Sequence, residues 1–180
     1  MVKVPIMQDS WQEKWKLFWL HGLPLWTTLF LMFLCLIPSD SVKINYFRPA
    51  IGLICVYYWT LKRGYIFGYI SAFVVGFFMD AFSSSPLVIN IMLMMLTMFA
   101  TQWLAHYIQS TSFGGGWLFF GLIGLGAFAV KWLLLAVYYR LLISPNEILF
   151  NYLSTLMFYP LIAAINVQVQ KLLPQERIDE

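Results

Sequence analysis

The chain has 180 residues, of which 61% are hydrophobic, 19% are aromatic and only 11% are charged. Soluble domains carry about 25% charged residues, so this chain has too few polar side chains to cover a water-soluble core. The formal net charge is +3, and the basic residues lie beside apolar runs instead of forming a run of their own. This pattern argues against nucleic-acid binding and predicts a single-domain membrane protein.

Six apolar runs separated by short intervals predict an all-α, polytopic bundle of about six transmembrane helices. The expected spans are about 17–37, 49–61, 65–82, 87–108, 117–139 and 148–169. A helix needs about 20 residues to cross the hydrocarbon core, and the second run has only 13. That run is therefore a short helix, a tilted helix extended by its neighbours, or a re-entrant hairpin that leaves five crossings. Residues 1–16 are expected to be a cytoplasmic or interfacial segment, 17–170 the transmembrane bundle and 171–180 a cytoplasmic tail.

The distribution of lysine and arginine predicts the orientation of the bundle. With an even number of crossings, both termini share one side of the membrane. That side collects seven basic residues, which are Lys3, Lys14, Lys16, Lys62, Arg63, Lys171 and Arg177. The opposite side has Lys43, Arg48 and Arg140, and Lys131 lies within the fifth run. Because basic residues accumulate on the cytoplasmic side, both termini are expected in the cytoplasm.

The third run carries a ridge of small residues that ends in a carboxylate. Gly64, Gly68, Ala72, Gly76 and Asp80 recur at every fourth position. In lipid, such a ridge lets another helix backbone approach closely, which is a main source of packing energy. The ridge therefore either packs inside the bundle or contacts a partner subunit.

Asp80 is the only carboxylate within an apolar run. A charge at membrane depth is costly and needs a partner. Arg48 and Lys131 are expected on the same, non-cytoplasmic half and are the candidate partners. Asp80 then has three possible roles: an ion pair, a cap on the helix that begins near Leu87, or a direct role in binding.

The sixth run has a polar stripe at the same four-residue spacing, formed by Asn151, Thr155 and Tyr159 and continued by Ala163. This stripe must face protein or water, so it either bonds to other helices or lines a small cavity. Gly114-Gly115-Gly116, between the fourth and fifth runs, is expected to form a flexible turn.

The sequence contains few groups that could perform chemistry. Cys35 and Cys55 lie inside apolar runs without a metal-ligand spacing, and His21 and His106 lie near span ends without an orienting partner. We find no nucleophile with a base and no paired carboxylates, so the chain is not expected to be an enzyme or to bind a metal or cofactor.

Several short motifs occur in order from the start of the second run to the end of the third. They are Phe47-Arg48-Pro49, Tyr58-Trp59, Ala72-Phe73, Gly76 and Asp80. Their order and spacing resemble the signature stretch of the rod-shape-determining MreD family, in which an Arg-Pro pair opens the second span, a Tyr-Trp pair closes it, and a Gly-x-x-x-Asp ends the third. The layout is similar over nearly the whole chain, including a proline in the last span, here Pro160. One departure is that the family often has a Leu-Gly pair shortly after the aspartate, where this chain has Leu87-Val88.

The resemblance implies a non-enzymatic protein of the bacterial inner membrane that acts with the bitopic protein MreC. Through MreC it would belong with MreB filaments and with the glycosyltransferase and transpeptidase that build the lateral cell wall. The family's fold is similar to the substrate-binding membrane subunits of energy-coupling-factor transporters. That likeness supplies an alternative function, the binding of a small molecule such as a vitamin for import.

Overall fold

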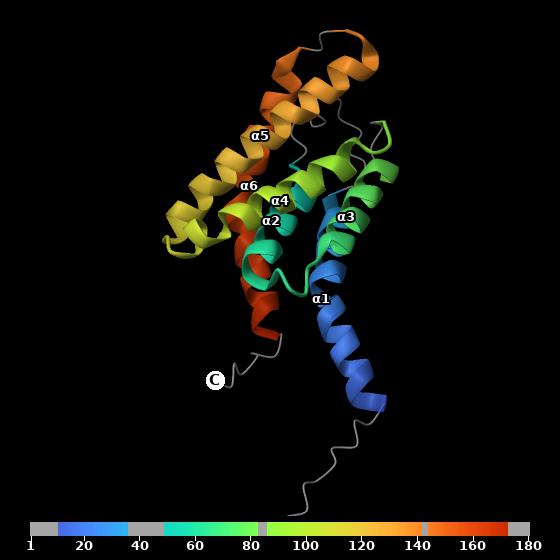
Figure 1. Cartoon of the computed structure of the whole chain (residues 1–180), viewed down its shortest axis with the longest axis vertical. Helices are drawn as coiled ribbons and strands as arrows, with labels where there is room; N and C mark the ends of the chain where they lie inside the picture. The colour runs from blue at the N-terminus through green and yellow to red at the C-terminus, as the bar shows by residue number, and fades with distance from the viewer. Residues whose placement is uncertain (1–10, 36–48, 83–85, 142–143, 173–180) are drawn as a thin grey trace, which may run out of the picture.

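The structure is a computed structural model that describes residues 11–35, 49–82, 86–141 and 144–172, and every regular element in these residues is an α-helix. The predicted all-α class is therefore confirmed. Each predicted apolar run corresponds to one helix (Figure 1). The helices are α1 (Trp11–Cys35), α2 (Ile51–Arg63), α3 (Tyr69–Phe82), α4 (Ile89–Gln109), α5 (Phe113–Tyr139) and α6 (Pro145–Leu172).

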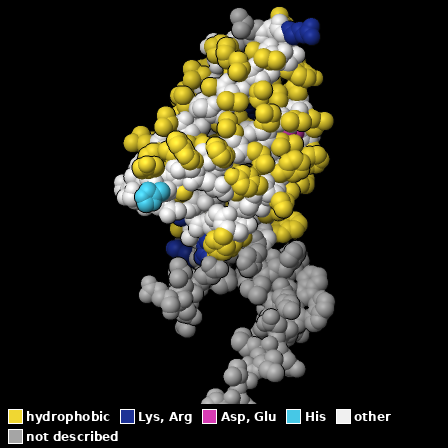
Figure 2. Space-filling model, in the orientation of Figure 1, with side chains coloured by type: hydrophobic (Ala, Val, Ile, Leu, Met, Phe, Trp, Pro, Cys, Tyr) yellow, Lys and Arg dark blue, Asp and Glu magenta, His cyan; other side chains and the backbone are white. Residues whose placement is uncertain are grey.

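Within the described residues, three helices are long and apolar enough to cross a membrane. They cover Ile89–Gln109, Gly114–Tyr139 and Pro145–Lys171, and the apolar stretches Gly22–Leu34 and Tyr69–Phe82 are shorter. Hydrophobic side chains cover most of the face shown in Figure 2, whereas lysine and arginine lie toward its upper and lower ends. An apolar band bounded by charge is the surface that a bilayer requires. The chain is a membrane protein.

The short second run forms the centre of the molecule. All residues of α2 from Ile51 to Thr60 are buried, and α2 packs against each of the other five helices. Its 13 residues span about 20 Å, short of the hydrocarbon thickness of about 30 Å. The sequence left three interpretations of this run open, and in the structure it is the first of them, a short helix. Protein encloses it from Ile51 to Thr60, so lipid does not set its length.

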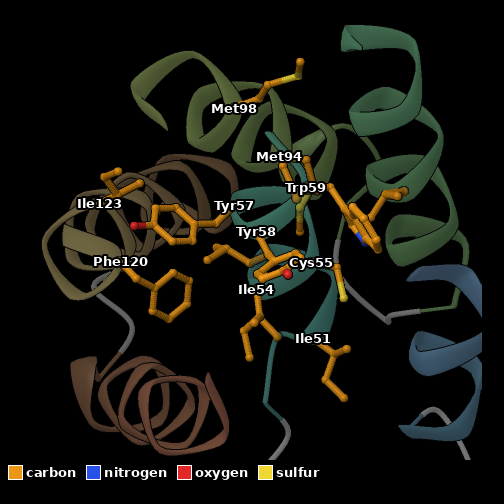
Figure 3. Packing of buried hydrophobic residues seen from close by; sticks show 14 of the residues in the cluster. Ile51, Ile54, Cys55, Tyr57, Tyr58, Trp59, Met94, Met98, Phe120 and Ile123 are labelled. Carbon is orange, nitrogen blue, oxygen red and sulfur yellow. The ribbon is translucent and has the colours of Figure 1, made fainter. Parts of the chain in front are cut away.

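Aromatic residues fill the space around α2. Tyr57 points toward Phe120 of α5, and Trp59 points to the opposite side of the helix (Figure 3). The rings of Phe120 and Tyr159 stack with centroids 4.5 Å apart, and Tyr57 meets both edge-on. These ring contacts bring α2, α5 and α6 together.

Hydrogen bonds join α2 to α6 at the start of α2 and in its second half. The amide of Ala50 donates to Thr155 Oγ1 at 2.9 Å, and the hydroxyl of Tyr58 donates to Gln170 Oε1 at 2.6 Å. Thr155 belongs to the polar stripe predicted on the sixth run, and its side chain bonds another helix. In an apolar interior, the cost of leaving such groups unpaired makes these bonds selective for one arrangement of the two helices.

Two segments differ from expectation at their starts. The third run was expected to be helical from residue 65, but a turn occupies this position, where the amides of Ile66 and Phe67 both donate to Arg63 O. The interpretation of Gly114-Gly115-Gly116 as a flexible turn is wrong, because these residues form the first turn of α5. A Cβ on Gly115 would lie 2.6 Å from Thr111 Cβ, so glycine is required there by close contact and not by a positive φ.

Candidate functional site

The carboxylate of Asp80, near the end of α3, caps the start of α4. Its oxygens accept hydrogen bonds from the amides of Val88 at 2.9 Å, Asn90 at 3.0 Å and Ile91 at 3.3 Å. The first amides of a helix have no partner within the helix and carry a partial positive charge. Asp80 is only 3% exposed, so the cap compensates its charge where water cannot. Of the roles weighed from the sequence, Asp80 makes the contacts of a helix cap.

A neutral amide connects Asp80 to the one lysine predicted at membrane depth. Asn90 Nδ2 donates to Asp80 Oδ1 at 2.9 Å, and Asn90 Oδ1 accepts from Lys131 Nζ at 3.3 Å. Asn90 is 1% exposed and bridges α3, α4 and α5. The ammonium also lies 6.0 Å from the centre of the Phe128 ring, within range of a weak cation–π contact. We call Asp80, Asn90 and Lys131 the Asp80 cluster.

Gly76 lets α3 lie directly against the start of α4. A Cβ at this position would stand 2.6 Å from Ile91 Cα and 3.0 Å from Ile91 N, both backbone atoms that cannot rotate away. Gly76 is one helical turn before Asp80, so the close approach places the α4 amides within reach of the carboxylate. At Gly76, the small-residue ridge packs inside the bundle. At Gly68, by contrast, a Cβ would meet nothing within 4 Å.

Val88 holds an unusual backbone conformation at this corner. Its φ is 87°, in the left-handed region where a β-branched residue is strained. The hydrogen bond from the Val88 amide to Asp80 holds the residue in this conformation. Glycine is the residue that adopts a positive φ without strain.

The remaining predicted site residues lie in different surroundings. Arg48, and with it the predicted pairing of Arg48 with Asp80, lies outside the described residues. Pro49 precedes α2 and accepts a hydrogen bond from the Ile51 amide. Tyr58, Trp59 and Ala72 are buried, whereas Phe73 is 47% exposed on the outer face of α3. Side chains at His21 and Cys35 lie outside what the structure describes, Cys55 is buried, and His106 is exposed on α4.

Sequence reasoning identified Asp80 and Lys131 but missed Asn90, which joins them. The available signal was an amide in the first turn of an apolar run, ten residues after the aspartate. Within the described residues, no group of three or more His, Cys, Asp or Glu side chains could hold a metal ion. The Asp80 cluster can neutralise charge at depth and fix the α3–α4 corner relative to α5.

Comparison of the chain with models of protein families, with curated proteins and with solved structures found no match.

Proposed function

We propose that the chain is an integral membrane scaffold of the bacterial cell-wall elongation machinery. It maintains rod shape through contacts with MreC and the peptidoglycan synthases, and it performs no catalysis itself. The motifs that resemble the MreD family are the first support for this function. The second support is structural, because the polar and small residues of these motifs contact other helices of the chain and stabilise the fold.

One observation carries the proposal furthest. Of the signature residues that the structure describes, Phe73 alone is exposed, whereas Tyr58, Gly76 and Asp80 are engaged with other helices of the chain. Phe73 shares the outer face of α3 with Phe77, which is 49% exposed. A scaffold needs a rigid frame and an apolar face that another membrane helix can contact. We therefore assign the partner contact to this α3 face.

The proposed topology has six crossings of the inner membrane with both termini in the cytoplasm. Figure 1 supports it, because the start of α1, the α2–α3 turn and the end of α6 lie toward the lower end of the bundle. Lys62 and Arg63 lie in the last turn of α2, just before that connection, and Lys171 lies in the last turn of α6. Grouping of basic residues at one end agrees with the cytoplasmic placement of that end.

A second candidate function is a substrate-binding membrane subunit of a small-molecule importer. It is favoured by three buried polar atoms of α6 that have no hydrogen-bond partner among the described residues, namely Asn151 Oδ1, Ser154 Oγ and Asn166 Oδ1. Buried polar atoms of this kind require water or a ligand. Genes for MreC and MreB beside this one would favour the scaffold, and a gene for an importer ATPase would favour the second function.

Co-purification with MreC tests the proposed partner face. We expect the Phe73→Ala, Phe77→Ala double variant to retain about tenfold less MreC than the parent, because two aromatic contacts are lost. The matched control is Leu153→Ala, Phe158→Ala on α6, whose side chains are similarly exposed at 42% and 41%. Equal retention of MreC by both double variants, at equal thermal stability, would remove the partner contact from α3.

A further inference from the structure

Pro160 interrupts the backbone hydrogen bonds of α6 in the middle of the helix. Proline has no amide N–H, so Pro160 cannot donate to Leu156 O, the carbonyl one turn earlier that an α-helix would give it as a partner. The proline ring also presses on that carbonyl and bends the helix. Because an unpaired backbone carbonyl is costly inside a membrane, Leu156 O needs a donor from outside α6.

The missing donor comes from α5. Trp117, near the start of that helix, donates its indole N–H to Leu156 O at 3.1 Å, which is an ordinary hydrogen-bond distance. Since Leu156 O is the carbonyl that Pro160 leaves free, the indole replaces an absent amide and does not compete with one. Neighbouring helices are expected to supply such partners where a proline lies inside a transmembrane helix.

Contacts on both sides of Trp117 fix its position. The hydroxyl of Tyr57, on the enclosed helix α2, donates to Gly116 O, next to Trp117, at 2.8 Å. One turn further along α5, a Cβ on Gly121 would lie 3.3 Å from Leu156 Cδ1, so α5 and α6 are in close contact there. The indole is therefore held in a defined place relative to both α2 and the bend in α6.

The bend at Pro160 decides where the end of α6 lies. Before the bend, α6 runs beside α5, and the hydroxyl of Tyr152 donates to a backbone carbonyl of that helix at 3.0 Å. After the bend, the end of α6 turns away from α5 (Figure 1). There Gln170 Oε1 accepts the hydrogen bond from the hydroxyl of Tyr58 on α2 at 2.6 Å. A different bend would move Gln170 away from Tyr58.

We propose that Pro160 and Trp117 form a latched hinge that positions the last part of α6, residues 161–172, against α2. Pro160 is the hinge. The hydrogen bond from the Trp117 indole to Leu156 O is the latch, because it fixes the direction of the bend. When this bond opens, the last part of α6 pivots about Pro160 and Gln170 leaves Tyr58. The hinge is independent of the proposed function, since it uses only contacts within the chain.

Distances between spin labels test the hinge in the full chain reconstituted in lipid. Nitroxides are attached through genetically encoded ketone side chains at Val137 on α5 and Val167 on α6, both exposed, so that the native cysteines remain. In Trp117→Phe we expect the ratio of displaced to parent-like distances to rise about fivefold, the equivalent of one lost hydrogen bond. The pair Val137 and Met157, which does not span Pro160, should keep the parent's distances.

Pro160→Ala provides the decisive control. It restores an amide that can donate to Leu156 O within α6, so Trp117→Phe should change no distance in that background. Trp103→Phe, which removes an indole from an exposed position on α4, should also leave the distances unchanged. A shift of equal size with and without Pro160 would mean that Trp117 acts through packing alone, and it would overturn the latch.

An isosteric replacement separates the hydrogen bond from the size of the ring. 3-Benzothienylalanine at position 117 keeps both fused rings of Trp117 but has no N–H, so it should reproduce the shift seen in Trp117→Phe. Parent-like distances between Val137 and Val167 with this side chain would show that the indole N–H does not set the bend, and would contradict the proposal.

Discussion

Gly76→Leu is expected to lower the stability of the folded chain by about 3 kcal/mol, at the upper end of typical overpacking costs. The reason is that the new side chain would begin 2.6 Å from Ile91 Cα, a backbone atom of α4. Separation of α3 from α4 would relieve the clash, but it would also move the α4 amides away from Asp80. A lower thermal midpoint in detergent and a lower abundance in membranes would be the measured effects.

The matched control is Gly68→Leu, four residues apart from Ala72 on the same small-residue ridge. A Cβ at Gly68 would meet nothing within 4 Å, so this variant should keep the parent's thermal midpoint. The comparison therefore separates close helix contact from the general effect of adding bulk to the ridge. A Gly76→Leu protein that is stable and abundant but has lost MreC would contradict internal packing and place the partner surface at Gly76.

Asp80→Ala is expected to destabilise the chain by about 3 kcal/mol, because a single carboxylate satisfies three amides and one side chain of α4. The change also removes the negative charge of Asp80 from the cluster, while Lys131 keeps its hydrogen bond to Asn90. Thermal unfolding in detergent measures the loss of stability. The double variant Asp80→Ala, Lys131→Met removes both charges, so its loss of stability should be smaller than the sum of the losses in the two single variants. A double-mutant cycle would detect this difference.

Two conservative substitutions sharpen this experiment. Asp80→Asn preserves the size of the side chain and one hydrogen-bond acceptor, so this variant should lose less stability than Asp80→Ala. Val88→Gly should raise the thermal midpoint, because it relieves the strain of a valine at φ 87° while leaving the carboxylate in place. If Asp80→Ala unfolds at the parent's temperature, Asp80 does not hold the α3–α4 corner.

The helices could be predicted from the sequence because each apolar run is bounded by polar or turn residues. Gly76 and Asp80 could also be singled out, since small residues at every fourth position and a charge at depth are both rare and physically constrained. Asn90 was missed because a neutral amide changes the hydropathy of a 20-residue run very little. Its importance follows only from its position between Asp80 and Lys131, which depends on how three helices pack.

The central position of α2 could not be predicted. Lipid and protein interior are similarly apolar, so a helix enclosed by other helices has the same composition as one that faces lipid. The shortness of the run was the available clue, but a short enclosed helix and a re-entrant hairpin both satisfied it.

Depletion of the protein from the bacterium that encodes it tests the proposed scaffold function most directly, provided that cell shape and vitamin uptake are measured in the same culture. The scaffold function predicts that elongated cells become round as the protein is lost, while uptake of labelled vitamins continues at the rate of undepleted cells. The rounding should be reversed by expression of the parent chain. Unchanged rod shape together with loss of uptake of one vitamin would contradict the scaffold function and identify the chain as an importer subunit.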